Sequence, residues 1–296
     1  MRLAAVGRAT HSAGSGAIWT GSYHPLAMTT RRDSARRGHL LPGLSYFEYQ
    51  RLVCRDVVLP WLEPRMPLAG VRVLDIGAHH GGMVDYLREE GTVGSAVALE
   101  LSAEVAASSP FVPDERFRLE AGDVLDLPED TPPFDLVLLH DVLEHIPARD
   151  RALASIRETL SSATGRVFVS FPPYYSGFGG HQQYARGVAR AIPFVHLLPA
   201  RLFYRVAAPG EQEYMTAEGA FEDLVSVRRT RLTLASAEAA FARAGFGVDA
   251  RELFLVRPEY TVRYGLNARG AGILGRLPGL REVAVNGAFY LLRPAG

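Results

Sequence analysis

Short apolar runs alternate along this chain with stretches in which apolar residues recur every three or four positions. The runs have the length and the nearly continuous hydrophobicity of strands covered on both faces of a parallel sheet. They occupy residues 71–76, 95–101, 117–121, 134–139 and 166–171. Helical stretches between them cover about 81–90, a segment that begins after Ser102 as N-cap, and about 149–160. This alternation predicts an α/β fold with crossover helices.

The pattern changes on either side of this core. A helix is predicted over 44–62, and after the fifth strand residues 172–232 break into aromatic, proline-containing and apolar pieces. A helix at about 236–244 and two strands at 248–256 and 283–292 complete the pattern. We therefore predict a doubly wound, mostly parallel, Rossmann-like sheet of seven strands with a lid inserted after strand five.

Residues 1–40 differ from the rest in composition. They are rich in Gly, Ser, Thr, Ala and Arg, and Asp33 is their first acidic residue. We expect a disordered N-terminal extension ahead of one domain over 41–296. Two alternatives stay open: an arginine-rich transit peptide, and an upstream mis-assigned start with Met28 as the true first residue.

The charge balance narrows the classes of function. The formal net charge is zero, so no basic field favours nucleic acid as a partner. All 32 basic residues are arginine, which excludes a lysine Schiff base or a lysine general base. The single cysteine, Cys54, excludes an internal disulfide and a multi-cysteine zinc site, and it favours a cytoplasmic location. No apolar run approaches the roughly 18 residues of a membrane-spanning helix, so we expect no stable membrane insertion.

Acidic residues and glycines mark the carboxyl ends of the predicted strands. Asp75 closes the first strand and precedes a loop bracketed by Gly77 and Gly81, while Glu100 and Asp123 end the next two strands. Ligands of doubly wound sheets bind at this edge. A carboxylate such as Glu100 can accept hydrogen bonds from both hydroxyls of a ribose. The pattern indicates a nucleotide-like ligand.

Four segments in the expected order resemble class I S-adenosylmethionine (SAM)-dependent methyltransferases. They are the loop segment 71–82, the strand end at Glu100, the Gly122–Pro128 segment, and the strand-four segment Phe134–Ile146. The last of these is similar to ubiquinone- and menaquinone-type methyltransferases, in which Glu-His-Ile or Glu-His-Val recurs. The resemblance covers about 71–171. A nicotinamide dehydrogenase is the weaker alternative, because the second glycine of Gly-x-Gly-x-x-Gly is absent here.

The resemblance implies SAM as cofactor and assigns it a set of residues. Asp75 is expected to organise the glycine loop and the methionine part of SAM, Glu100 to bind the ribose, and Asp123 to accept from the adenine amino group. The remaining expected cofactor contacts are Gly77, His79, Gly81, Leu101 at the adenine face, the backbone N–H of Val124, and His140. His79 replaces the middle glycine of the family loop, and it either faces the cofactor or fills the turn.

Histidines supply the candidates for acid–base chemistry. Methylation of an oxygen benefits from a general base near neutrality, and the candidates are His181 after strand five and His140 and His145 after strand four. We find no metal-ligand spacing among these residues, and no metal is expected. His140 is also expected to line the cofactor or acceptor pocket.

The lid at 172–232 carries many aromatic side chains and is the expected acceptor site. A small-molecule, lipid-linked or glycan acceptor would each fit; alternatively, the aromatic residues form a second small core or a homodimer contact. We predict a methyltransferase that acts on a small molecule or biosynthetic intermediate, most plausibly at oxygen. The alternative is a SAM-binding protein of the same fold without methyl transfer.

Overall fold

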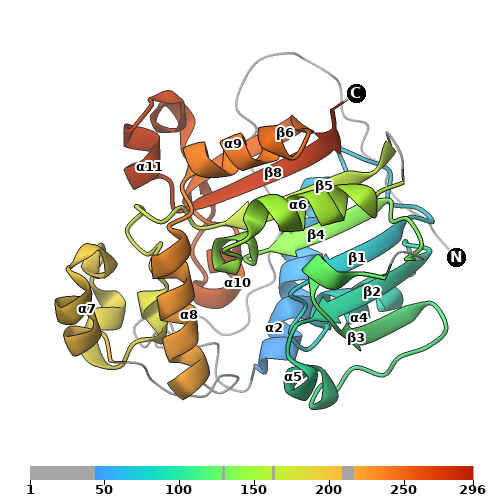
Figure 1. The fold of residues 1–296 in the computed structure, drawn as a ribbon, viewed down its shortest axis with the longest axis horizontal. Coiled ribbons are helices and arrows are strands. Elements are labelled where there is room, and N and C mark those ends of the chain that lie inside the picture. The colour runs from blue at the N-terminus through green and yellow to red at the C-terminus, as the bar shows by residue number, and fades with distance from the viewer. Residues whose placement is uncertain (1–43, 129–130, 162–163, 209–216, 296) are drawn as a thin grey trace, which may run out of the picture.

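Parallel strand pairing forms the centre of the molecule, which a computed structural model describes over residues 44–128, 131–161, 164–208 and 217–295. The strands are β1 (Arg72–Ile76), β2 (Ser95–Glu100), β3 (Phe117–Ala121), β4 (Leu136–His140), β5 (Arg166–Phe171), β6 (Phe246–Val256), β7 (Arg269–Gly270) and β8 (Gly287–Pro294). They form one sheet in the order β3-β2-β1-β4-β5-β8-β6-β7 (Figure 1). The predicted extension at 1–40 lies outside the described residues.

The doubly wound sheet is confirmed, with two corrections. β1 to β5 pair in parallel, and β8 is antiparallel to both β5 and β6. The sheet has eight strands rather than seven, because the two-residue β7 pairs with β6 at the edge. The predicted strand at 283–292 is wrong at its start, where Leu280–Ala284 forms helix α11. The Glu282 carboxylate accepts from the backbone N–H groups of Leu234 and Ala235, which ties α11 to the start of α9.

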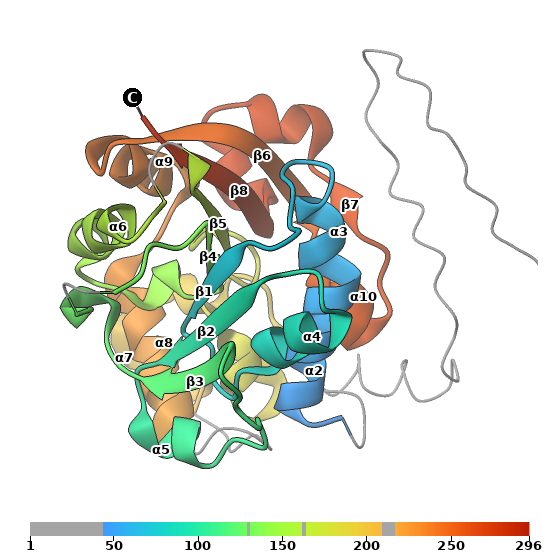
Figure 2. The same ribbon diagram turned by 90° about the vertical axis from the view of Figure 1, so that its right-hand side faces the viewer.

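Helices cover both faces of the sheet (Figure 2). On one side lie α2 (Tyr46–Val53), a π-type turn (Cys54–Val58), α3 (Leu59–Leu62), α4 (Gly82–Glu90) and α10 (Glu259–Tyr264). On the other lie α6 (Arg149–Glu158) and α9 (Leu234–Arg243), while α5 (Ala103–Ala107) follows β2. The helix predicted over 44–62 therefore exists, interrupted by the π-type turn.

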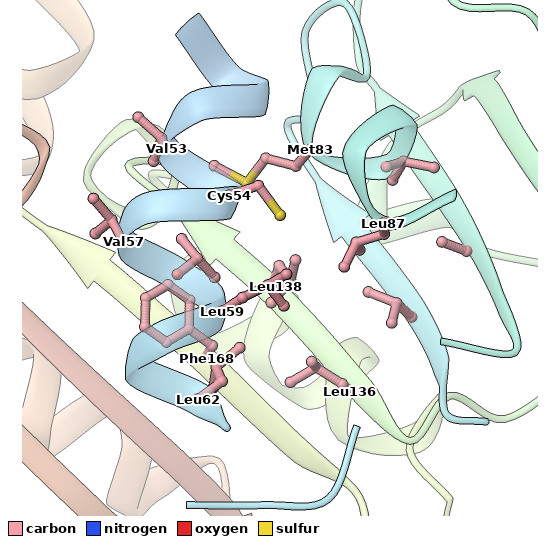
Figure 3. Packing of buried hydrophobic residues seen from close by; sticks show 14 of the residues in the cluster. Val53, Cys54, Val57, Leu59, Leu62, Met83, Leu87, Leu136, Leu138 and Phe168 are labelled. Carbon is pink, nitrogen blue, oxygen red and sulfur yellow. The ribbon is translucent and has the colours of Figure 1, made fainter. Parts of the chain in front are cut away.

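Alternation along the strands divides the core into two layers. Leu136 and Leu138 of β4 face the α2–α3 side, where Figure 3 shows them beside Leu59 and Phe168. Val137 and Leu139, the intervening residues, pack on the α6–α9 side. Successive side chains of a strand point to opposite faces, so each layer receives every second residue.

The segment 172–232, called the insertion below, leaves the sheet after β5. It contains 3-10 turns at Gln182–Tyr184, Gly187–Ala191 and Val195–Leu197, and helices α7 (Ala200–Val206) and α8 (Ala217–Thr230). Phe203 of α7, Leu224 of α8 and small neighbours form a third, separate apolar cluster. The insertion therefore has a small core of its own. Among the described residues, no helix combines the length and hydrophobicity needed to cross a membrane.

Helix α2 lies close to the start of α4. A Cβ added at Gly82 would lie 2.3 Å from the carbonyl oxygen of Phe47 in α2. We predict that Gly82→Ala lowers the free energy of unfolding by about 1–3 kcal/mol, because two backbones must separate. Urea denaturation measures the change.

The matched control is Gly270→Ala, whose Cβ would meet only the Leu253 carbonyl oxygen, at 4.0 Å. This variant should stay within about 0.5 kcal/mol of the wild type. Equal stability of the two variants would contradict the close α2–α4 approach.

Candidate functional site

A cavity of about 560 Å³ opens at the carboxyl ends of the central strands. The chain leaves β1 toward β2 and β3 on one side, while β4 and β5 lie on the other, so the loops after β1 and β4 diverge here. Residues of both loops line the cavity, together with residues of α2, the insertion and α10. Of the sequence-predicted site residues, those in its wall are Asp75, Gly77, His79, His140, His145 and His181.

The glycine loop after β1 is held from two sides. The backbone N–H groups of Gly77 and Ala78 both donate to the Leu99 carbonyl, at 2.8 and 3.1 Å. From α2, the buried Gln50 amide donates to the Ala78 carbonyl at 2.8 Å and accepts from the Gly82 N–H at 3.3 Å. Gly77 has φ +69°, and a Cβ there would lie 2.6 Å from Val142 Cγ2. The position therefore requires glycine.

His79 fills the turn and also lies on the cavity wall. Its φ is +52°, its ring centroid lies 4.7 Å from that of Tyr46, and its backbone N–H donates to Glu100 Oε2 at 2.8 Å. Burial, and secondarily the neighbouring His80, lower the pKa of His79 to about 4. The imidazole is therefore neutral near pH 7 and presents no charge to a ligand.

The side chain of Asp75 is buried, and one of its oxygens lacks a hydrogen bond in the described part of the chain. It is 3% exposed at the end of β1, and its Oδ2 makes no hydrogen bond within the described residues. Burial raises its pKa to about 7, with His140 lowering it and Glu100 raising it further. A buried carboxylate without donors is costly. A ligand that brings a donor or a positive charge into this cavity would stabilise the ionised form of Asp75.

The other predicted cofactor residues lie outside the cavity wall, at or just after the ends of β2 and β3 or, for Gly81, at the start of α4. The Glu100 carboxylate accepts from the Ser102 N–H at 2.9 Å, and Asp123 accepts from the Leu125 N–H at 2.9 Å. Leu101 is 71% exposed, whereas the Val124 side chain is buried in the core. Gly81 has φ +74° as the N-cap of α4. Asp75, Glu100 and Asp123 thus end three adjacent parallel strands, which is an arrangement that fits an extended nucleoside ligand.

A network of buried charges lies beyond β4. Arg257, which follows β6, donates to both carboxylate oxygens of Asp141 at 2.6 Å and to Glu259 Oε1 at 2.6 Å. His140 Nε2 lies 3.4 Å from Glu259 Oε1. Burial alone would raise the pKa of Asp141, but Arg257 and His140 outweigh it and hold that pKa below its usual range. Burial likewise lowers the pKa of His140, yet Asp141 and Glu259 raise it overall.

A second polar cluster joins the β4–α6 loop to the insertion. His181 Nδ1 lies 2.8 Å from Asp223 Oδ1 on α8, and its Nε2 lies 3.7 Å from Glu144 Oε1. His145 Nε2 lies 3.6 Å from Asp223 Oδ2, and its Nδ1 lies 2.8 Å from the Ser226 hydroxyl. The structure therefore brings together two of the predicted histidines, with ring centroids 5.0 Å apart.

The charges in this cluster follow from burial. Burial lowers the pKa of His145, against the opposing effect of Asp223. Desolvation would raise the pKa of Asp223, but the two histidines lower it, so this carboxylate is ionised at pH 7. Glu144 is buried, and within the described residues neither of its carboxylate oxygens has a hydrogen bond. Burial, and secondarily Asp141, raise the pKa of Glu144 well above its usual value.

Metal-ligand spacing is not evident in the sequence, but the fold gathers two sets of ligand-type side chains. Ligand atoms of Glu144, His145 and His181 lie within 4.8 Å of one another, as do those of His140, Asp141 and Glu259. Arg257 already occupies the second set as a cation. The expectation of no metal stays a prediction.

Several cavity residues escaped the sequence analysis. Arg257 and Glu259 directly follow the apolar strand that ends at Val256. The expectation that functional residues follow the carboxyl end of a strand, applied to this strand, would have identified both residues. Tyr46 and Tyr49 of α2 and Asp223 of α8 carry no such signal, because only the tertiary structure brings them to the cavity.

The comparisons with known proteins agree with this geometry. A family model described as "Methyltransferase domain" matches residues 46–248, more than half of the chain. The ubiquinone biosynthesis O-methyltransferase of Xylella fastidiosa (strain 9a5c) is 31% identical over 119 residues, which cover 38% of this chain and 47% of that protein. The match thus spans about half the length of that relative.

A solved structure shares the fold. An S-adenosylmethionine-dependent methyltransferase from Mesorhizobium loti is 18% identical with a TM-score of 0.50, over 81% of this chain and 99% of that one. Magnesium protoporphyrin IX methyltransferase from Synechocystis PCC 6803, solved with bound S-adenosylhomocysteine, is 15% identical with a TM-score of 0.48, over 89% and 94% of the two chains. The family match and the predicted motifs together make this chain a member of the class I methyltransferases, enzymes that use SAM as cofactor.

Proposed function

We propose that this chain transfers the methyl group of SAM to an oxygen atom of a small-molecule or biosynthetic-intermediate acceptor, in the cytoplasm. The observation that carries the choice of oxygen is the buried His181–Asp223 pair in the wall of the same cavity as Asp75. A hydroxyl acceptor must lose a proton during methyl transfer, and an oriented imidazole is suited to accept it. The buried, unpaired Cys54 supports the reducing location.

In this proposal the strand ends hold the cofactor. Asp75 and the loop from Gly77 to Gly81, with His79, bind the methionine part; Glu100 accepts from the ribose hydroxyls. Asp123, the Val124 N–H and the exposed Leu101 surround the adenine. Bound SAM supplies an electrophilic methyl group on a sulfonium. The chain contributes the position of the acceptor, and most of the acceleration comes from holding its oxygen in line with that methyl group.

The insertion supplies the proposed base. When His181 donates its Nδ1–H to the ionised Asp223, its Nε2 retains a lone pair that can take the acceptor proton. Asp223 fixes this tautomer and stabilises the imidazolium that forms. His145 contacts the same carboxylate and helps to hold it. Asp141 and Glu259 raise the pKa of His140 against the effect of desolvation. They thereby favour its protonated form, which cannot accept a proton, so His140 is better suited to lining the pocket.

The acceptor is proposed to bind under the insertion, against aromatic rings. Tyr184 and Phe178 of the insertion, Tyr46 and Tyr49 of α2, and Tyr260 of α10 all line the cavity. Aromatic walls with a few polar groups suit a ring-bearing or amphiphilic molecule.

Substitution of the base separates catalysis from cofactor binding. We predict that His181→Ala lowers turnover by about 10²–10⁴-fold, and Asp223→Asn by a smaller factor, while the dissociation constant of SAM stays within about two-fold. Release of S-adenosylhomocysteine, measured over a panel of phenols and hydroxylated amphiphiles, gives turnover, and calorimetry gives affinity. Equal loss of turnover and affinity in His181→Ala, or no loss of either, would contradict the assignment.

The raised pKa of Asp75 predicts a pH-dependent stability. The folded chain keeps this proton up to about pH 7, whereas an unfolded aspartate releases it near pH 4. Raising the pH through that window therefore destabilises the wild type relative to Asp75→Asn, by up to about 4 kcal/mol. Urea denaturation of both proteins at pH 4.5 and 7.5 measures the difference.

Cofactor binding provides the companion readout. If SAM stabilises the ionised carboxylate, its binding to the wild type at pH 6.5 releases protons, and the binding enthalpy then depends on the buffer. Asp75→Asn should show no such dependence. A stability difference that does not change with pH would refute the buried, protonated Asp75.

A further inference from the structure

Exposed apolar side chains gather on one part of the insertion. The 3-10 turns at Gly187–Ala191 and Val195–Leu197, together with α7, form a lobe beside α8 at the edge of the molecule (Figure 1). Among the described residues, eight of the sixteen exposed large apolar side chains belong to the insertion. They are Tyr175, Val188, Ile192, Phe194, Leu197, Leu202, Val206 and Phe221. Six of these eight lie between Val188 and Val206, the stretch that forms the lobe.

Helix α7 shows how the lobe is built. Phe203 and Ala207 point into the small core of the insertion and are fully buried. Leu202 and Val206, four residues apart and 47% and 44% exposed, form an outer apolar stripe. Arg201 and Arg205, also four residues apart, are exposed next to that stripe. An apolar stripe bordered by arginines is typical of a helix that lies in a membrane interface.

The charge of residues 159–210, which include the lobe, points to the same partner, whereas the acidic residues of the insertion all follow residue 210. The chain as a whole has equal numbers of acidic and basic residues, yet no Asp or Glu occurs between Glu158 and Glu211. The exposed arginines of this stretch, Arg186, Arg201 and Arg205, lie on the lobe. The lobe is therefore complementary to an anionic surface. Exposed apolar side chains bordered by arginines suit the headgroup region of an anionic bilayer.

The lobe adjoins the cavity. Arg190 and Ala191 line the cavity, and the neighbouring exposed residues Val188 and Ile192 are 80% and 46% accessible. An apolar molecule that leaves a bilayer at this surface would reach the cavity along the turn at Gly187–Ala191. The outer surface and the cavity wall are thus two sides of one short segment.

We propose that the lobe docks on the surface of a bilayer that contains anionic lipids, with α7 lying among the headgroups. Leu202 and Val206 enter the apolar boundary, and Arg201 and Arg205 contact lipid phosphates. On the basis of the proposed function, the acceptor is then an amphiphile that enters the cavity from the membrane.

Co-sedimentation of the full chain with vesicles tests the docking surface. We expect binding to vesicles of phosphatidylcholine with 30 mol% phosphatidylglycerol, and much weaker binding to phosphatidylcholine alone. Arg201→Gln/Arg205→Gln should weaken binding to the anionic vesicles by about 25-fold, because each arginine near such a surface contributes a factor of about five. Leu202→Ser/Val206→Ser should weaken binding to both kinds of vesicle.

The matched control is Ile273→Ser/Arg276→Gln, which removes an exposed apolar residue and an arginine between β7 and α11. It should bind vesicles like the wild type. Failure of the wild type to sediment with anionic vesicles, or equal weakening by the control, would overturn the proposal. So would a wild-type dimer that the α7 variants dissociate without any vesicle binding, because a second copy would then cover the lobe.

Calorimetric titration of SAM into each variant keeps the two proposals apart. All variants should bind SAM like the wild type, which also shows that they are folded. Vesicle binding lost with SAM binding intact concerns the lobe alone. A variant of α7 that loses SAM binding as well would contradict a docking surface separate from the cofactor site.

Discussion

The site depends on one buried guanidinium. Arg257 follows β6, which β5 and β8 separate from β4 in the sheet, yet it bonds to Asp141 at the end of β4 and to Glu259 at the start of α10. Asp141 itself has φ +56°, and its backbone N–H bonds to the Ser170 carbonyl of β5. Without the guanidinium, the buried Glu259 carboxylate and the part-buried Asp141 carboxylate would lose their shared cation, which destabilises the loop. Arg257 thereby fixes the loop after β4 and the helix that closes the cavity.

Segments that are distant in sequence meet around the loop held by Arg257 and form the cavity. Gln50 of α2 holds the glycine loop through Ala78, and α10 packs against α2 through Val262 in the shared core. The Thr230 hydroxyl at the end of α8 donates to the carbonyl of Glu144, which lies in the loop after β4. This hydrogen bond anchors the insertion. Asp223, the partner of the proposed base His181, therefore lies on a helix that is itself tied to the loop after β4. In the proposed function, the loop after β4 therefore joins the cofactor side of the cavity to the acceptor side.

Sequence patterns identified the residues at the strand ends. They did not identify the partners that the fold brings to them from distant parts of the sequence. Asp75, Glu100 and His140 were predictable because each follows an apolar run whose length defines where a strand stops. His181 was found by its chemistry, but its partner Asp223 lies 42 residues further on, on a helix that the aromatic and proline-containing insertion concealed. The turns of the insertion lack the periodicity on which helix assignment depends. The two-residue β7 and the helical Leu280–Ala284 escaped for the same reason, since each is too short to show a period.

Calorimetric titration of SAM into the wild type and Glu100→Ala tests the central claim, that the cofactor binds across the ends of β1 to β3. Glu104→Ala, an exposed carboxylate in the following helix α5, is the matched control. The account predicts one site with a dissociation constant on the order of micromolar, weakened at least ten-fold in Glu100→Ala through lost charge-assisted hydrogen bonds and unchanged in Glu104→Ala. A folded wild type that binds no SAM, or a Glu100→Ala variant that binds it as tightly, would contradict the account.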